Sequence, residues 1–307
     1  MGNITNKLNL PAELVTDIFS KVKGHSSVAA LCGSDPIPFS GIDVMTFSLD
    51  DEAELVGEGG EKSPGGATFT PVTIKPFKLI YQHRVTDEFV HMNEEKRLPY
   101  LQAFGDGFTK KIARAIDITS FHGLNPKTGL IAASIRPNCF DQKITNVVTY
   151  NASTPDANIE SAIALIQAND ADVTGVAMAP DFASAMATVK VNGVVQYPEF
   201  RFGGKPTNFA GYGCDINGTV KYGVNTKDKA IIGDFQNAFK WGYAANMPLE
   251  IIEYGDPDGQ GDLKRKNQVV LRSEAYIGFG ILDKDAFALI KTSGAQGATG
   301  ATGATGA

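Results

Sequence analysis

Cysteine is scarce in this chain of 307 residues, which has only three. Cys32, Cys139 and Cys214 are odd in number and far apart in sequence, which is not the pattern of a disulfide framework or of clustered zinc ligands. We therefore expect small buried apolar side chains at these positions rather than reactive thiols.

Long apolar runs are missing as well. No stretch approaches the roughly 20 apolar residues that a membrane span requires, and the N-terminus has charged and polar residues where a signal peptide has its apolar core. We therefore expect no membrane partner and a chain that is made and kept in the cytosol.

An excess of positive charge is absent too, because 34 acidic residues outnumber 28 basic ones and leave a formal charge of −6. The one dense basic cluster, Lys264, Arg265 and Lys266, stands beside an acidic turn and is interpreted as a solvated loop. A sequence-specific DNA binder normally carries a basic face, so the composition disfavours that class.

Residues at catalytic or metal-binding spacing are also lacking. No HExxH, GxSxG or Walker sequence occurs, and the glycine-rich segment Gly57–Gly66 does not end in GK[ST] before a helix. The DPDGQGD segment that starts at Asp256 lacks the full ligand pattern of a calcium loop, and we interpret it as a polar hairpin turn. We predict no enzymatic activity, no catalytic residue, no cofactor and no metal site. The four histidines are isolated in sequence: His25, His83, His91 and His122.

A glycine-rich acidic segment joins two stretches with strand-like alternation. Phe47–Val56 and Phe69–Val85 flank Gly57–Gly66, a pattern that predicts a long hairpin with a flexible tip. A two-stranded ribbon is marginal alone in water, so its apolar side needs a partner surface. Either the rest of this chain or a neighbouring subunit must supply that surface.

Helical and strand patterns follow one another along the rest of the chain. Helical spacing predicts a short helix over Asn9–Lys23 and a long one that is capped by Thr86 or Asp87, interrupted by Pro99 and ended near Gly123. Shorter predicted elements are helices at Ile159–Gln167 and Pro180–Val189, strands at Val173–Met178 and within Ala230–Phe239, turns over Gly203–Gly213, and a second hairpin of Leu249–Tyr254 with Gln268–Ile281.

Four segments carry a family resemblance: ELVGEGGEK with TFTPVTIKPFKLIYQHRVTDEF, the long helix ending in DITSFHG, AIIGDFQNAFKWG, and VVLRSEAYIGFGILDKDAFALIK. In order and spacing they resemble a major capsid protein of tailed double-stranded DNA bacteriophages, of the Hong Kong 97 type, from about Leu10 to Lys291. The resemblance implies an α+β fold with five parts. These are an N-terminal arm (1–42), an extended β-hairpin or E-loop (43–82), a peripheral domain with a long spine helix and a β-hairpin (83–124 and 246–273), an axial α/β domain (125–245 and 274–293) and a collagen-like Gly-X-Y tail (294–307) that we expect to be disordered.

The resemblance also implies a function. In this family the E-loop lies over an adjacent subunit, and hexamers and pentamers assemble into an icosahedral shell around packaged double-stranded DNA. The implied partners are further copies of the chain, a portal protein, a separate scaffolding or decoration protein, and DNA held by proximity without sequence-specific contact. The implied location is the virion, after assembly in the host bacterial cytoplasm. Candidate inter-subunit contacts are Glu54, Glu58, Glu61, Lys62, Phe69, Lys75, Lys78, Asp256, Asp258, Lys264, Arg265 and Lys266.

Two departures from the family pattern limit what carries over. Only a short arm precedes Phe39, so we expect scaffolding by a separate protein or none. Some members form a lysine–asparagine cross-link, but Lys62 and Asn267 do not match that motif and are interpreted as ordinary surface residues. Two other functions stay open: an encapsulin-type shell of a bacterial nanocompartment, which shares the fold, and a collagen-like surface-interaction protein, which rests on the tail alone.

Overall fold

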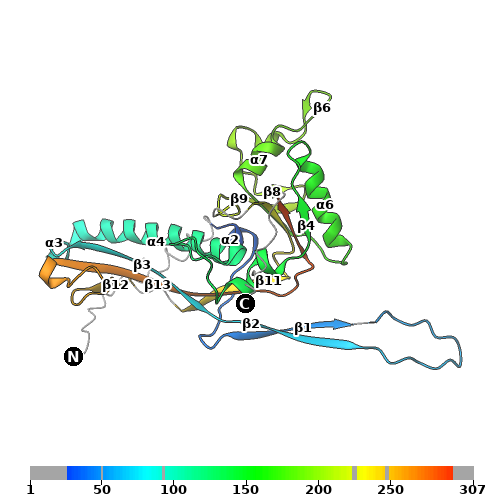
Figure 1. Ribbon diagram of the computed structural model, residues 1–307, viewed down its shortest axis with the longest axis horizontal. Helices are drawn as coiled ribbons and strands as arrows, with labels where there is room; N and C mark the ends of the chain where they lie inside the picture. The colour runs from blue at the N-terminus through cyan, green and yellow to red at the C-terminus, as the bar shows by residue number, and fades with distance from the viewer. Residues whose placement is uncertain (1–25, 50, 92–93, 223–226, 246–248, 293–307) are drawn as a thin grey trace, which may run out of the picture.

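The computed structural model describes residues 26–49, 51–91, 94–222, 227–245 and 249–292. The helix predicted over Asn9–Lys23 and the Gly-X-Y tail lie outside these residues. Figure 1 shows an elongated body in which a long helix lies on a sheet, a second body of helices and strands beside it, and a hairpin that projects away from both. Among the described residues, no helix combines the length and apolar character needed to cross a membrane.

The elongated body is an antiparallel sheet built around its longest strand, β13 (Gln268–Ile281). Strand β3 (Phe77–Thr86) pairs along one edge of β13, while β12 (Leu249–Ile252) and β11 (Phe239–Ala245) pair along the other. The pairing of β12 with β13 confirms the second predicted hairpin. A short 3-10 helix, η3 (Lys264–Lys266), lies in the loop that connects them.

Helix α4 (Glu94–His122) covers one face of this sheet. It follows the short helix α3 (Glu88–His91). Apolar residues at helical spacing form its buried side, among them Phe108, Ile112 and Ile116. These side chains pack against the residues of β13 that point the same way, including Ala275, Ile277 and Phe279. The helix is therefore held by burial of one stripe against the sheet.

The ends of α4 confirm one prediction and correct another. Gly123, with a φ of +60°, stops the helix in the left-handed conformation that favours glycine, as the sequence predicts. Pro99, however, does not interrupt the helix, which begins five residues earlier at Glu94. Pro99 lacks the N–H that would donate one turn back, and its ring crowds the carbonyl there, but only the first turn of the helix precedes it and the later turns keep their hydrogen bonds.

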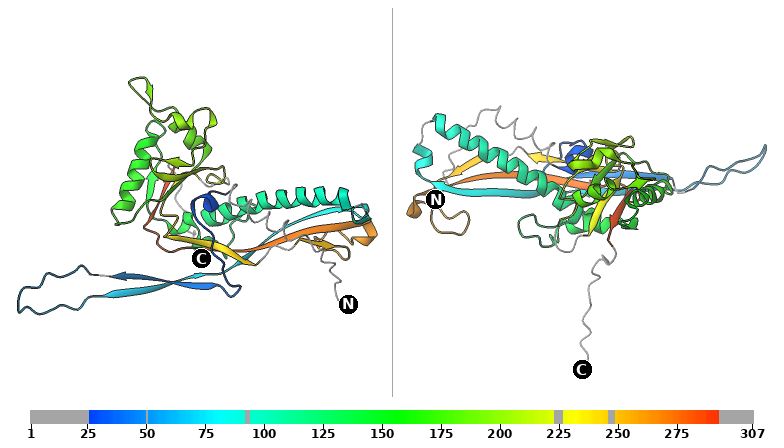
Figure 2. Two further views of the ribbon diagram at one scale, coloured as in Figure 1. Left: turned by 180° about the vertical axis from the view of Figure 1, so that it is seen from behind. Right: turned by 90° about the horizontal axis from the view of Figure 1, so that it is seen from above.

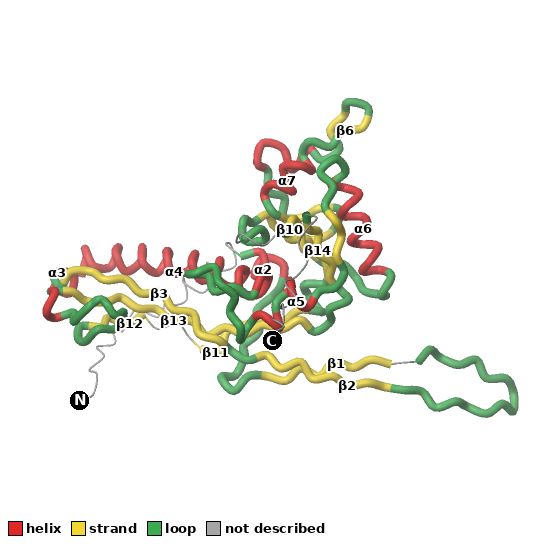
Figure 3. Tube along the Cα trace, viewed as in Figure 1, coloured by secondary structure: helices red, strands yellow, loops and turns green. Residues whose placement is uncertain are grey.

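The second body contains a mixed six-stranded sheet in the order β4-β14-β10-β5-β9-β8. Figure 3 shows strands of this sheet in yellow, with β10 and β14 labelled. Helices α6 (Pro155–Gln167) and α7 (Pro180–Met186) pack on one face of it. Both begin with proline at the first helical position, where no N–H is needed. The first starts four residues before the predicted Ile159. The strands are β4 (Val147–Thr149), β5 (Gly175–Met178), β8 (Asn208–Phe209), β9 (Tyr212–Ile216), β10 (Asp228–Gly233) and β14 (Phe287–Lys291), and the remaining short elements are α2 (Ser27–Leu31), η1 (Arg136–Asn138), α5 (Phe140–Lys143), β6 (Lys190–Val191), β7 (Val194–Val195) and η2 (Pro198–Gly203).

A cluster of buried phenylalanines joins the two bodies. The ring of Phe140 in α5 lies 5.6 Å from Phe121 of α4, 5.2 Å from Phe239 of β11 and 5.0 Å from Phe287 of β14, measured between ring centroids. Tilted and edge-to-face pairs at these distances stabilise beyond the burial of their area. The C-terminal end of α4 is thus packed against both sheets at once.

The three cysteines are buried and unpaired, as predicted. Burial raises the pKa of Cys139 to about 11, with the nearby charge of Asp141 adding to the rise. Because the thiolate is the reactive form, this thiol stays protonated and inert at neutral pH.

The segment before the projecting hairpin runs alongside β11. The N–H of Asp35 donates to the carbonyl of Trp241 at 3.0 Å, and the N–H of Ile37 donates to the carbonyl of Tyr243 at 2.9 Å. Gly242 lies between these two bonds, and a β-carbon there would stand 1.5 Å from the carbonyl oxygen of Asp35. Only glycine lets the two backbones approach this closely.

Replacing Gly242 by alanine is therefore expected to lower the free energy of unfolding by about 1–3 kcal/mol, the usual cost of forcing extra atoms into a packed interior. Urea denaturation measures the loss. Gly33→Ala is the control, since a β-carbon at Gly33 would meet nothing within 4 Å. An equal loss in both variants would contradict the close-approach argument.

The first predicted hairpin differs from the structure in its second strand. Strand β1 (Ile42–Leu49) pairs with β2 (Ala67–Ile74), and the chain then turns at Lys75 and Pro76 into β3, which joins the sheet of β13. The single strand predicted over Phe69–Val85 is therefore wrong, and so is the extension of the first strand to Val56. The period-two apolar pattern continues across the turn and hides it. Pro76, which cannot donate a ladder hydrogen bond, is the signal that marks the break.

Candidate functional site

The hairpin of β1 and β2 projects from the molecule with no other described element beside its distal part (Figures 1 and 2). One of its faces is apolar, because the cross-strand pairs on it are Met45 with Pro71, Phe47 with Phe69, and Leu49 with Ala67. The ring centroids of Phe47 and Phe69 lie 4.9 Å apart, and the two rings are tilted by 45° to each other. These side chains are exposed all the same, at 59% for Met45, 56% for Phe47 and 63% for Phe69.

The base of the hairpin is seated on the sheet face opposite α4. There the buried Ile74 of β2 lies over Gly278 and Gly280 of β13, which alternate with the residues that face α4. A β-carbon at Gly280 would stand 2.8 Å from Cγ1 of Ile74, so the two glycines make room for the crossing. The hairpin therefore leaves the molecule on the side of the sheet away from α4.

The tip of the hairpin is acidic, and hydrogen bonds within the tip stabilise its turn. The carboxylate of Glu54 accepts the backbone N–H of Ser63 at 3.0 Å, which lowers the pKa of Glu54, and Asp51 accepts the N–H of Gly66 at 2.8 Å. Of the predicted contact residues in and next to the hairpin, Glu58, Glu61, Lys62 and Lys75 are exposed and have no side-chain partner among the described residues.

Most of the predicted contacts outside the hairpin have partners within the chain. Lys78 pairs with Glu274 at 2.6 Å, Lys264 with Asp87 at 3.4 Å, and the ammonium of Lys266 donates to the carbonyl of Gln260. Arg265 alone among them has no side-chain partner in the described ranges.

Asp256 and Asp258 both contact the side chain of Arg84, a residue that was not among those predicted from the sequence. The Arg84 guanidinium donates to both oxygens of Asp258, to Asp256 at 3.2 Å and to the carbonyl of Gly261 at 2.8 Å. These bonds hold the predicted polar turn against β3 and lower the pKa of Asp258 to about 2. Arg84 is far from the turn in sequence, so no local pattern reveals the contact.

Asp117, near the end of α4, ties together segments that are distant in sequence. Its buried carboxylate accepts the backbone N–H of Ser27 at 3.0 Å and of Val28 at 3.2 Å, and so caps the start of α2. Burial raises the pKa of Asp117 to about 6, although its hydrogen bonds oppose the rise. Three side chains complete these bonds: Ser26, Thr219 and Asn217.

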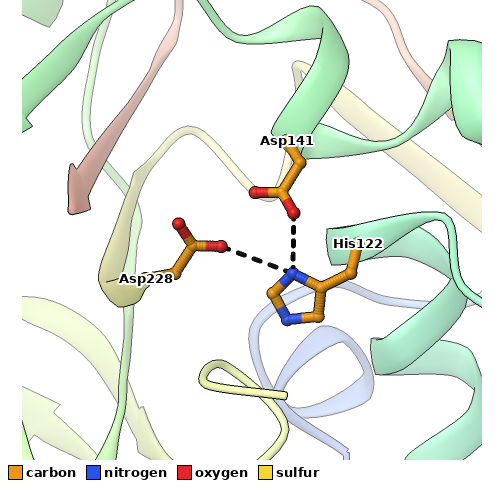
Figure 4. Close-up of side chains that lie close together, drawn as sticks. All are labelled: His122, Asp141 and Asp228. Carbon is orange, nitrogen blue, oxygen red and sulfur yellow. Dashed lines mark hydrogen bonds and ion pairs between the residues drawn. The ribbon is translucent and has the colours of Figure 1, made fainter. Parts of the chain in front are cut away.

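His122, the last residue of α4, lies in a buried group of charges (Figure 4). Its Nδ1 is 2.9 Å from Oδ2 of Asp141 and 3.3 Å from Oδ2 of Asp228. Its Nε2 is 2.9 Å from the carbonyl oxygen of Thr219, so both ring nitrogens face acceptors, as suits the doubly protonated imidazolium. Nζ of Lys291 lies 2.9 Å from Asp141 and 3.2 Å from Asp228.

The charged groups of this cluster shift one another's pKa values. Burial by itself lowers the pKa of His122, but its contacts with Asp141 and Asp228 outweigh that effect and raise the pKa to about 9. Burial acts to raise the pKa of Asp141, yet the contact with His122 brings it well below its usual range. The pKa of Asp228 is raised, by burial and by the neighbouring charge of Asp141.

One ligand atom each from His122, Asp141 and Asp228 lies within 4.8 Å of the others, the spacing of a possible metal site. The ammonium of Lys291 already contacts both carboxylates, however, and supplies the positive charge that a metal ion would bring. The group is therefore a buried salt-bridge network, which links α4 to α5, β10 and β14.

The network makes stability depend on pH. The pKa of His122 in the folded chain, about 9, lies above its ordinary value of 6.5, so the stabilisation is fully present below pH 6.5 and is lost as the pH rises through 9. We expect the free energy of unfolding, measured with urea, to fall between these values. His122→Gln, which lacks the titrating group, should show a shallower fall, and an equally steep one would contradict this assignment.

Comparison with known proteins decides the family. The model of the phage capsid family matches residues 7–292. The chain belongs to the phage capsid family. It is a structural protein, a major capsid protein whose copies form an icosahedral shell. The resemblance inferred from the four sequence segments is confirmed, and the encapsulin and collagen-like alternatives gain no support.

One solved structure supports this assignment by sequence identity, and two others share the fold. A chain of Mycobacterium phage Ogopogo is 36% identical, with a TM-score of 0.76 over 88% of this capsid protein and 92% of that chain. A chain of Gordonia phage Cozz is 23% identical, with a TM-score of 0.71 over 89% and 86%. A structure described as the capsid of a native GTA particle shares the fold at 15% identity, with a TM-score of 0.63 over 95% and 94%. Among curated proteins, none matches this chain.

Proposed function

We propose that the hairpin of β1 and β2 lies over an adjacent copy of the capsid protein and that this contact builds hexamers and pentamers. The observation that carries the proposal is the apolar face of Met45, Phe47 and Phe69, which is exposed and has no other described element beside it. Burying one such side chain contributes roughly 1.5–3 kcal/mol before the costs of association. A second copy is the partner because a shell presents the same surfaces repeatedly.

The other parts of the chain take their places around this contact. We propose that the peripheral domain (83–124 and 246–273) meets neighbouring copies at three-fold and quasi-three-fold positions, and that the axial domain (125–245 and 274–293) lies near the five-fold and six-fold centres. Strand β13 crosses the boundary at residue 273, and its partner β11 lies on the axial side. Because β13 continues from one domain into the other, we expect the two domains to move together.

The remaining partners belong to the same proposal. The shell encloses packaged double-stranded DNA, carries a portal protein and takes a separate scaffolding or decoration protein, after assembly in the host bacterial cytoplasm. A formal charge of −6 supports a shell wall that encloses DNA, because the subunit as a whole does not attract the negatively charged duplex.

Electron microscopy of the purified full-length chain tests the proposal. Closed shells, or capsomers with five and six copies, are the expected result, with the hairpin of each copy resolved against its neighbour. A chain that stays monomeric at high concentration would contradict the proposal. Shells in which the hairpin extends freely into solvent would contradict the role given to its apolar face while leaving shell formation in place.

A further inference from the structure

The exposed side of α4 carries a cluster of positive charge in a chain that is acidic overall. Lys110, Lys111 and Arg114 are all exposed, and none has an ion-pair partner in the part of the chain that the structure describes. Positions three and four apart lie next to each other on a helix, so the three form one patch, here called the basic strip. Asp106 is the only acidic residue among the exposed positions of α4 between Leu98 and Arg114.

The basic strip and the hairpin lie on opposite sides of the elongated body. The hairpin crosses the sheet face that bears Gly278 and Gly280, whereas α4 covers the other face with its apolar stripe and turns the strip outward. In a shell whose copies all present the same face outward, hairpins that overlap neighbours occupy one surface of the wall. The basic strip then belongs to the other surface.

We infer that the basic strip faces the lumen of the shell and contacts the phosphate backbone of packaged duplex DNA. The inference rests on the proposed packaging function. Three cations without an ion-pair partner among the described residues, on one helix face, suit a polyanion. Phosphates follow one another every 3.4 Å or so of helix axis along each DNA strand, so about four residues of α4 can meet more than one of them. We expect no sequence preference, because long flexible cations that contact phosphate oxygens do not distinguish one base from another.

An acidic protein segment is the competing occupant, and this chain contains one. The hairpin tip carries Asp51, Glu52 and Glu54 followed by Glu58 and Glu61. Its position on the opposite side of the body favours DNA over the tip of another copy. The experiment below separates the two occupants.

The test uses capsomers released from shells of the full-length chain and a fluorescent 30-base-pair duplex of arbitrary sequence. The variant is Lys110→Gln, Lys111→Gln and Arg114→Gln, which keeps good helix formers at exposed positions. The matched control is Lys264→Gln, Arg265→Gln and Lys266→Gln, which removes the same charge from the β12–β13 loop. Anisotropy between 50 and 200 mM salt gives the slope of log affinity against log salt.

Each phosphate contact contributes about 0.9 to that slope. The slope of the strip variant is expected to be smaller in magnitude by roughly 2.7. Over this fourfold rise in salt, the affinity of the unmodified capsomer for the duplex should therefore fall about 40-fold more than that of the variant. The control should keep the original slope. An unchanged slope in the strip variant, or an equal loss in the control, would overturn the inference.

Two further readouts distinguish this inference from the proposed function. Closed empty shells should not bind external duplex through the strip, and strip-dependent binding by closed shells would overturn the lumenal assignment. Electron microscopy of the strip variant should show closed shells, since the hairpin contact is untouched. A variant that binds duplex normally but fails to close shells would assign the strip to a protein partner instead of DNA.

Discussion

Replacing Phe69 by aspartate is expected to abolish shell assembly while the subunit stays folded. The Phe69 side chain is 63% exposed and its ring lies tilted against that of Phe47, so the change removes little from the core of the isolated chain. In the shell, it would place a charge in the apolar contact between copies, where both the lost burial and the unpaired charge oppose association. We expect at least a tenfold lower yield of closed shells, measured by electron microscopy and sedimentation.

Thr70→Asp is the matched control for this change. Thr70 follows Phe69 on the same strand, is also exposed, and points to the opposite face of the hairpin. The variant should assemble like the unmodified chain. If both variants fail to assemble, the loss comes from charge anywhere on the hairpin and not from its apolar face. If Phe69→Asp assembles normally, the proposed hairpin contact is wrong.

Replacing His122 by alanine is expected to lower the free energy of unfolding by about 3–5 kcal/mol, the cost of breaking a buried ion pair by removing one partner. The imidazole is completely buried, and its loss would leave the carboxylates of Asp141 and Asp228 close together without the charge of His122 between them. The cavity adds to this cost because the side chain sits among packed residues. Urea denaturation of the unassembled chain measures the change.

His83→Ala is the control, because His83 lies exposed on β3 and its loss should change the free energy of unfolding by less than about 0.5 kcal/mol. A loss below about 1 kcal/mol for His122→Ala would contradict a stabilising role for the network. The two predictions also probe different levels of the molecule. The first should spare the subunit and destroy the shell, whereas the second should weaken the subunit itself.

The elements that sequence patterns predict well are those whose signals are local. The apolar stripe of α4 and its stop at Gly123 depend on neighbours within a few turns. The presence of a hairpin with a glycine-rich tip depends on alternation and glycine, although the bounds predicted for its two strands were wrong. Sequence patterns do not mark a boundary where the apolar alternation continues unbroken, as between β2 and β3. The same apolar alternation serves two strands that belong to different sheets.

The buried contacts could not be predicted in this way. His122 is isolated in sequence, yet the fold brings Asp141, Asp228 and Lys291 around it from three separate elements. Arg84 meets Asp258 only because β3 pairs with residues 268–277 of β13, next to the loop that carries Asp258. Cations at positions 110, 111 and 114 look unremarkable in a chain of net negative charge until the helix places them on one exposed face.

By itself, the sequence resembled a capsid protein, and it predicted a long helix, two hairpins and an apolar side on one hairpin that needs a partner. Those conclusions depend on the order and spacing of residues along the chain. Only the tertiary structure decided that the apolar side stays exposed, that the hairpin leaves on the face opposite α4, and which charges meet in the interior. The physical reason is that exposure, facing and the pairing of distant charges depend on how the elements pack, and packing joins residues that no local pattern connects.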